Sequence, residues 1–238
     1  MKVALVCIAK NEDNYINEWI NYHLKIGFDD IFVYKNDWNF NICRQNVFEY
    51  QLNGRNKQTE SYNLFINTYK NSYDYAAFFD VDEFLVLHKH KNIQELIKDY
   101  GDFNALAFNW VLFGNNGLEK IENNDYSVLK RFTKRQKNVN QHVKILVNLS
   151  KNLVMDIHNC NLSAIDTHFN EFSGPFNPNG SIEIAQLNHY FCKTMPEYIE
   201  KISRGRANGT ENLPLYAFDA HNYNEVEDFS ALNFYLKS

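Results

Sequence analysis

Short apolar runs alternate with amphipathic stretches over the first third of this 238-residue chain. Residues 2–8 are a continuous apolar run, which is typical of a central strand covered on both faces. The next stretch repeats apolar residues at helical spacing, and it predicts a helix that begins near Asn11 or Asp13 and ends at Gly27. A second apolar run follows at 30–34. This strand, helix, strand order predicts two parallel strands with a right-handed connection.

The rest of the chain continues as an α/β pattern and then becomes rich in strands. A capping box of Thr194 and Glu197 marks the start of a late helix, and the tail after Asn208 has weak signals. The length fits one compact domain over residues 1–238, and no repeat or linker divides it. We therefore expect an α/β, Rossmann-like single domain with a central mixed, mostly parallel sheet flanked by helices. The further elements predicted are strands at 47–50, 76–79, 84–87, 105–113, 127–132, 142–148, 154–159 and 182–188, and helices at 59–70, 93–100 and 195–204.

Composition and charge exclude several classes of protein. A net charge of -5 argues against a general nucleic-acid binder, which needs a surplus of Lys and Arg on one face. A local basic group predicts a solvated face, with peripheral membrane association as the alternative: Lys130, Arg131, Lys134, Arg135 and Lys137. The sequence has no apolar run of about 20 residues and no signal peptide, and its four cysteines lack ligand-like spacing. We expect a cytoplasmic protein with reduced thiols.

The most informative motif places two carboxylates directly after an apolar strand. Asp80 and Asp82 follow Phe79, and Glu83 comes next. Carboxylates at the carboxyl end of a strand suit Mg²⁺ or Mn²⁺ shared with a nucleotide diphosphate. Three acids in four residues would repel one another unless something neutralises them. An EF-hand is excluded, because Leu85 and Lys91 stand where its Gly and Glu belong.

Together with this motif, several segments resemble the GT-A glycosyltransferases of family 92 and their family-2-like bacterial relatives. The resemblance covers residues 3–207 and implies a nucleotide-binding part at about 1–90, an acceptor-binding part at about 91–210 and a tail at 211–238. The segments that carry it are Cys7–Glu12, Tyr15–Asp29, Phe79–Leu85, Trp110–Gly117, His142–Lys144, His158, Leu187–Lys193 and Arg204–Ala207.

The resemblance implies a donor site and a metal site. Asp80, Asp82 and His189 would bind the cation, and Lys193, directly before a capped helix, would face the diphosphate. Asp37 departs from the family pattern at the end of the second strand. The residues expected beside the nucleotide are Ile8, Ala9, Asn11, Glu12, Asp37, Gln58, Tyr62, Asp80 and Lys193, with Asn63 next to them. Asn11 and Glu12 have the alternative role of starting the first helix.

Acceptor and base residues follow from the same comparison and from strand geometry. An inverting transfer needs a general base near the acceptor hydroxyl. Asp156 and His158 alternate along the predicted strand 154–159 and would share one face, which makes them a candidate catalytic pair. Arg204 and Arg206 are expected to pair with the acidic cluster of Asp80, Asp82 and Glu83. The residues expected at the acceptor are Glu83, Trp110, Phe113 and Gly114. Four further acids could serve as the base instead: Glu122, Asp125, Asp166 and Asp219.

The sequence thus predicts a metal-dependent glycosyltransferase that moves a sugar from a nucleotide diphosphate sugar, UDP-linked, to a glycan or glycolipid. We expect inversion, with retention left open. Usage rich in Asn, Lys and Ile indicates a bacterial source and a surface polysaccharide or lipopolysaccharide as product. One alternative is a phosphatase of the haloacid dehalogenase type with Asp80 as nucleophile, although Phe84 departs from its pattern. The other is a binding module without turnover.

Overall fold

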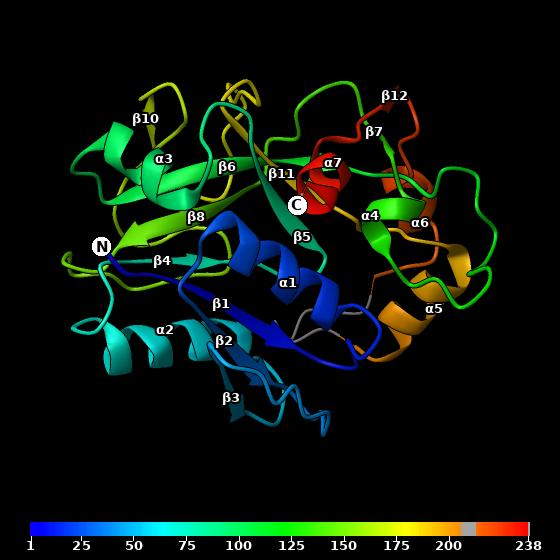
Figure 1. The fold of residues 1–238 in the computed structure, drawn as a ribbon, viewed down its shortest axis with the longest axis horizontal. Coiled ribbons are helices and arrows are strands. Elements are labelled where there is room, and N and C mark those ends of the chain that lie inside the picture. The colour runs from blue at the N-terminus through cyan, green and yellow to red at the C-terminus, as the bar shows by residue number, and fades with distance from the viewer. Residues whose placement is uncertain (206–212, 238) are drawn as a thin grey trace.

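A ten-stranded mixed sheet forms the centre of the computed structural model, which describes residues 1–205 and 213–237. Eight strands lie in the order β10-β9-β6-β8-β4-β1-β2-β3, and β11 joins β5 to β6 (Figure 1). Its strands are β1 (Val3–Ala9), β2 (Asp30–Lys35), β3 (Val47–Gln51), β4 (Tyr75–Phe78), β5 (Glu83–Leu87), β6 (Ala105–Leu112), β8 (Val143–Asn148), β9 (Ala164–Ile165), β10 (Glu171–Phe172) and β11 (Ala185–His189). A separate pair consists of β7 (Lys134–Arg135) and β12 (Val226–Glu227).

The half of the sheet formed by β4, β1, β2 and β3 is parallel throughout. All seven residues of β1 are buried, as the continuous apolar run predicts. Antiparallel β8 lies between β4 and β6 and makes the sheet mixed. The expected α/β architecture with a mixed sheet is confirmed.

Helices cover both faces of the sheet, and alternate residues of β1 point to two different cores. Val3, Leu5 and Cys7 pack with α1, whereas Ala4, Val6 and Ile8 pack with α2. Figure 1 shows α1 and α2 on opposite sides of β1, with α5 beyond its carboxyl end. The helices are α1 (Ile16–Ile26), α2 (Gln58–Tyr69), α3 (Ile93–Tyr100), α4 (Val128–Arg131), α5 (Met195–Ser203), α6 (Ala217–His221) and α7 (Ser230–Leu236).

Two predicted strands are wrong, and side-chain hydrogen bonds explain why. The strand expected at 127–132 is helix α4, whose N-terminus is capped by Ser127 and fixed by Glu18, which accepts from the Val128 amide at 2.8 Å. The strand expected at 154–159 is absent. Asn63 accepts from the Met155 amide and donates to its carbonyl, both at 2.9 Å, so a side-chain amide replaces the strand ladder there.

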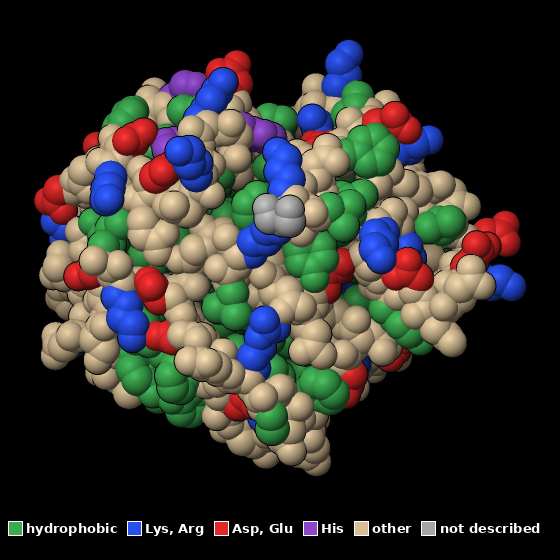
Figure 2. Space-filling model, viewed as in Figure 1, with side chains coloured by type: hydrophobic (Ala, Val, Ile, Leu, Met, Phe, Trp, Pro, Cys, Tyr) green, Lys and Arg blue, Asp and Glu red, His purple; other side chains and the backbone are tan. Residues whose placement is uncertain are grey.

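The late predictions are confirmed in part. The capping box at Thr194 begins α5 as expected. The strand predicted at 182–188 is the shorter β11, and the weakly patterned tail forms α6, β12 and α7. No helix in the described part of the chain combines the length and apolar character that crossing a membrane requires. On the face shown in Figure 2, Lys and Arg are interspersed with Asp and Glu rather than gathered in one patch.

Glu197 joins three helices beside the carboxyl end of the sheet. Its carboxylate accepts two hydrogen bonds from Arg131 of α4, at 2.8 and 2.9 Å, and one from Tyr15 at 2.7 Å. It also accepts from the hydroxyl of Thr194 at 2.6 Å. Burial alone would raise the pKa of Glu197, but these donors outweigh burial and lower it to about 2. The cluster holds α5 in place.

Replacing Glu197 with Gln should therefore remove an acid-sensitive part of the stability. A carboxyl with a depressed pKa stabilises the fold above its unfolded value near 4.5, and this contribution is lost as pH falls toward about 2. We expect E197Q to lose up to about 3 kcal/mol at pH 7 and progressively less at pH 3. Urea unfolding across this pH range measures it. The exposed neighbour variant E200Q is the control, and an equal loss at pH 7 and pH 3 would contradict the assignment.

Candidate functional site

The site lies where the carboxyl ends of β1 and β4 meet the end of β11. Because β1 and β4 are parallel neighbours, Glu12 and Asp80 leave the sheet at one edge. Strand β11 pairs antiparallel with β5, which places His189 opposite Glu83. The Tyr190 amide donates to the Asp82 carbonyl at 2.9 Å. Backbone pairing thus brings His189 beside the carboxylate of Asp82, from which it is far removed in sequence.

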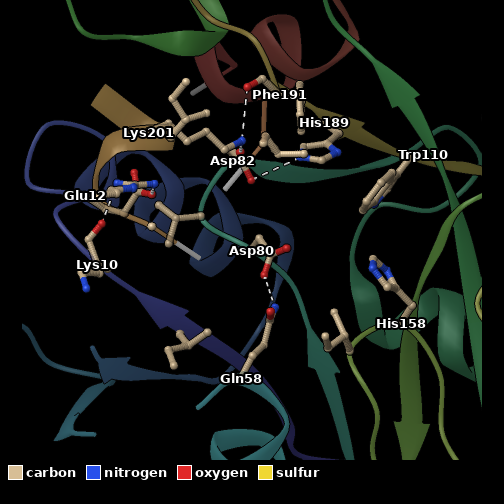
Figure 3. Close-up of a pocket in the computed structure, with 17 residues that line it drawn as sticks. Lys10, Glu12, Gln58, Asp80, Asp82, Trp110, His158, His189, Phe191 and Lys201 are labelled. Carbon is tan, nitrogen blue, oxygen red and sulfur yellow. Dashed lines mark hydrogen bonds and ion pairs between the residues drawn. The ribbon is translucent and has the colours of Figure 1, made fainter. Parts of the chain in front are cut away.

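A pocket opens over this edge, with side chains from both halves of the chain around it (Figure 3). Acidic and basic side chains line its floor, and Ile8 and Ile157 form an apolar wall. The residues that line it are Ile8, Lys10, Glu12, Gln58, Asp80, Val81, Asp82, Trp110, Ile157, His158, His189, Phe191, Lys201, Ile202, Arg204, Gly205 and Leu213.

Asp82 stands between a histidine and a lysine. Its Oδ1 lies 3.5 Å from His189 Nε2, and its Oδ2 accepts from Lys201 Nζ at 2.7 Å. Burial would raise the pKa of Asp82, but Lys201 and His189 hold it well below its usual range. Burial lowers the pKa of His189, with Asp82 acting in the opposite direction. Asp82 is therefore ionised at neutral pH, and the imidazole retains a lone pair.

Asp80 and Glu83 are neutralised from below the pocket by Lys144 of β8. The Lys144 ammonium is completely buried and lies 3.0 Å from Asp80 Oδ2 and 3.9 Å from Glu83 Oε2. Glu83 also accepts from the Asp80 amide at 2.7 Å, and Gln58 donates to Asp80 Oδ1 at 2.8 Å. Burial would lower the pKa of Lys144, but the two carboxylates raise it above its usual value. Lys144 thus offsets the repulsion that three acids in four residues predict.

Asp82 and His189 fit one divalent cation, whereas Asp80 does not join them as a third ligand. Two ligands 3.5 Å apart can share a cation, and Mn²⁺ accepts an imidazole beside a carboxylate. Among the described residues, no group of three or more His, Cys, Asp or Glu side chains could hold a metal ion. Mg²⁺ and Mn²⁺ commonly take one or two protein ligands together with waters and substrate phosphates, so the pair makes a weak site on its own and a phosphate would complete it.

Trp110 forms the opposite wall, among three histidines. Its ring stacks on His142 with centroids 4.9 Å apart, and those of His189 and His158 lie at 4.3 and 5.3 Å. Its buried Nε1 has no hydrogen-bond partner within the described chain. His158 Nδ1 lies 3.1 Å from the Val143 carbonyl, which assigns the proton to Nδ1 and a lone pair to Nε2. Burial, and then Lys144, lower the pKa of His158 to about 3.

The expected nucleotide residues divide into two groups. Four of them line the pocket: Ile8, Glu12, Gln58 and Asp80. The others lie outside it. Ala9 and Tyr62 are buried in the core, Asn11 faces solvent, and Asp37 is exposed and pairs with Lys10 at 3.4 Å. Lys193 is also buried, with its ammonium 4.2 Å from the Tyr15 ring centroid, so the structure turns it away from the pocket.

Four acceptor and base assignments need correction. Glu83 is fully buried and turns toward Lys144, and Phe113 packs in the core on Tyr190. Gly114 lies against the C-terminal segment, where a Cβ would come within 2.3 Å of the Tyr223 carbonyl oxygen. Asp156 is exposed and outside the pocket, because the strand that would have aligned it with His158 does not form. Trp110 and His158 do reach the pocket.

Three basic residues of the site were missed or placed elsewhere by sequence reasoning. Lys144 carried a signal, since a lysine within an apolar strand must be paired when it is buried. Lys201 gave none, because its position in the last turn of α5 is typical of a solvated residue. Arg204 pairs with Glu12 rather than with the acidic cluster that follows Phe79, and it also lines the pocket. Arg206 lies outside the described residues.

This chain is similar in sequence to known glycosyltransferases. Residues 42–190 match the sequence profile of glycosyltransferase family 92. A glycosyltransferase family 92 protein of Oryza sativa subsp. japonica is 24% identical over 220 residues, which cover 85% of this chain. The chain spans about a third of that rice protein, 36% of its length.

Solved structures give only distant likenesses. TarS of S. aureus is 14% identical over 52% of this chain and 23% of its own, with a TM-score of 0.35. A putative glucose-1-phosphate thymidylyltransferase from Bacillus anthracis, in complex with a sucrose, is 8% identical over 62% of this chain and 72% of its own, with a TM-score of 0.39.

Proposed function

The chain belongs to glycosyltransferase family 92, and on that premise we propose that it transfers a sugar from a UDP-sugar to a hydroxyl of a glycan or glycolipid. One observation carries the proposal. An ionised Asp82, a neutral His189 and the basic Lys201 and Arg204 converge on one pocket at the carboxyl edge of the sheet. A nucleotide diphosphate needs this combination of metal ligands and positive charge.

Asp82 and His189 would hold Mn²⁺ or Mg²⁺. Such a cation would offset the charge that develops on the departing diphosphate. Asp80 has a different task in this proposal, since Lys144 and Gln58 already orient its carboxylate. Its oxygens remain acceptors for a donor hydroxyl on the pocket side, where the Asp80 side chain is 32% exposed.

His158 is the proposed general base. Its Nε2 lone pair would accept the proton of the acceptor hydroxyl as the acceptor oxygen bonds to the anomeric carbon. The bond from that carbon to the diphosphate oxygen breaks, and its electron pair leaves with the diphosphate, which gives inversion. A bound diphosphate would raise the low pKa of His158, because negative charge favours the imidazolium. Trp110 would pack on a sugar ring.

The wider role in this proposal is synthesis of a bacterial surface polysaccharide or lipopolysaccharide. Amino-acid usage rich in Asn, Lys and Ile supports it. The protein would act in the cytoplasm, with peripheral contact to the inner face of the membrane where a glycolipid acceptor is presented.

Isothermal titration with UDP, GDP and CMP, each with and without Mn²⁺, tests the proposal. We expect binding of UDP that requires Mn²⁺, after which UDP-sugars are screened for UDP release. If a folded protein binds none of the three nucleotides in the presence of Mn²⁺, the proposal fails. Release of phosphate from a monoester, with its loss in D80N, would then support the phosphatase alternative.

A further inference from the structure

Lys201 occupies the side of Asp82 that faces the pocket, next to the place proposed for the cation. We propose that the Lys201 ammonium competes with the divalent cation for Asp82 and moves to the donor diphosphate when both ligands bind. This would couple the binding of metal to the binding of nucleotide. The inference rests on the proposed function, since it requires a diphosphate and a cation in this pocket.

Three contacts hold the Lys201 ammonium at the pocket, where its side chain is not fully buried. Its Nζ donates to Asp82 Oδ2 at 2.7 Å and to the Phe191 carbonyl at 3.2 Å. It also lies 4.4 Å from the centroid of the Phe191 ring. The Lys201 side chain is 21% exposed, and that of Asp82 is 10% exposed. Because its side chain is partly exposed, Lys201 can leave Asp82 without opening the core. Figure 3 shows Lys201 at the pocket beside Asp82 and Phe191.

Electrostatic repulsion prevents the Lys201 ammonium and a divalent cation from both binding Asp82 closely. A divalent cation bound between Asp82 and His189 would bring two positive charges close to the ammonium in a partly buried pocket, where screening is weak. The lysine has a flexible four-carbon stem and can turn toward a new anion. The donor diphosphate is such an anion. It would bind the same cation and would therefore lie close to Lys201.

Three other basic groups at the site contact partners other than Asp82. Lys144 is fully buried with Asp80, and Lys193 is buried over the Tyr15 ring. Arg204 pairs with Glu12 and donates to the Lys10 carbonyl at 2.6 Å. Among the cations described in the pocket, Lys201 alone shares Asp82 with the proposed metal position. It is thus the one that can exchange partners.

Competition of this kind predicts that removing the ammonium changes the affinities for Mn²⁺ and for UDP in opposite directions. Removing the ammonium frees Asp82, so Mn²⁺ alone should bind more tightly. The diphosphate loses a partner, so UDP in the presence of Mn²⁺ should bind more weakly. By linkage, the coupling free energy between the two ligands must fall. A merely structural role would weaken both affinities together.

The experiment measures MnCl₂ affinity without nucleotide, and UDP affinity at saturating Mn²⁺, for the full chain and for K201M. We expect Mn²⁺ to bind about tenfold more tightly to K201M, and UDP about tenfold more weakly. K201R, which keeps the charge, should stay near the wild type. K151M is the matched control, because it removes a partly exposed lysine that pairs with Asp102 outside this pocket and should leave Mn²⁺ affinity unchanged.

The outcomes separate this inference from the proposed function. If the wild type binds UDP with Mn²⁺ but K201M binds Mn²⁺ equally or more weakly, Lys201 does not compete for Asp82 and the inference is overturned. A wild type that binds neither ligand overturns the proposed function instead. Thermal unfolding of K201M shows whether the variant is folded, and K201Q, which also lacks the ammonium, gives a second test if it is not.

Discussion

The substitution D82N is expected to abolish Mn²⁺-dependent binding of UDP. We also expect it to reduce the turnover of any UDP-sugar that the wild type uses by at least about 100-fold. The amide of D82N keeps the shape of the side chain but removes the negative charge. That charge pairs with Lys201 at 2.7 Å and lies 3.5 Å from His189, so the variant leaves the Lys201 ammonium without its counter-ion. The proposed cation loses its one anionic protein ligand.

Titration calorimetry measures the lost binding, and UDP release measures the lost turnover. D102N is the matched control, since it removes a carboxylate that is 75% exposed, lies outside the pocket and pairs with Lys151. The control should behave as the wild type. If D82N retains Mn²⁺-dependent UDP binding within threefold, Asp82 does not hold the cation.

The Lys144 ammonium is expected to carry the largest single contribution to stability at the site. K144M keeps most of the side-chain volume but leaves Asp80 and Glu83 facing each other without a counter-ion. Breaking a buried ion pair by removing one partner costs about 3–5 kcal/mol, and we expect a loss of this size in urea unfolding at pH 8. The fully buried Glu83 is the main source, because its carboxylate has no access to water.

The pH dependence of K144M follows from Glu83. Burial raises the pKa of Glu83, opposed by Lys144 in the wild type and reinforced by Asp80 and Asp82. Without Lys144, Glu83 stays protonated to higher pH. A raised pKa stabilises the fold below the unfolded value, and that contribution is lost as pH rises through the folded value. K144M should therefore become less stable from pH 5 to pH 8.

The double variant K144M/E83Q separates charge from packing. Replacing Glu83 with a neutral amide removes the buried charge, so we expect the double variant to recover most of the lost stability at pH 8. It also keeps the test valid if K144M alone does not fold. A double variant as unstable as K144M would mean that Lys144 acts through packing.

Local sequence signals determined the amino-terminal half of the fold and the position of the acidic motif. A short stretch of sequence suffices to predict each of three features: the apolar run of β1, the amphipathic α1 that ends at Gly27, and the strand before Asp80. Hydrophobic periodicity is a local property, so it can be read without knowing the fold. The edge of a parallel sheet then predicts where ligands bind.

Side-chain interactions across the chain defeated the same reasoning elsewhere. Residues 154–159 have the composition of a strand, yet Asn63 of α2 bonds both backbone groups of Met155 and no ladder forms. Without a strand, Asp156 and His158 do not share the face that strand alternation predicts for them. Lys193 looked like a diphosphate ligand next to a capped helix, but its ammonium lies over Tyr15 inside the protein.

The sequence by itself determined that this chain is an α/β protein with a carboxylate pair at the edge of a parallel sheet. Tertiary structure decided which groups meet those carboxylates. The pairing of β11 with β5 brings His189 to Asp82, antiparallel β8 places Lys144 beneath Asp80, and α5 carries Lys201 to the pocket. Such contacts join residues far apart in sequence, so their charge and distance exist only once the sheet has assembled.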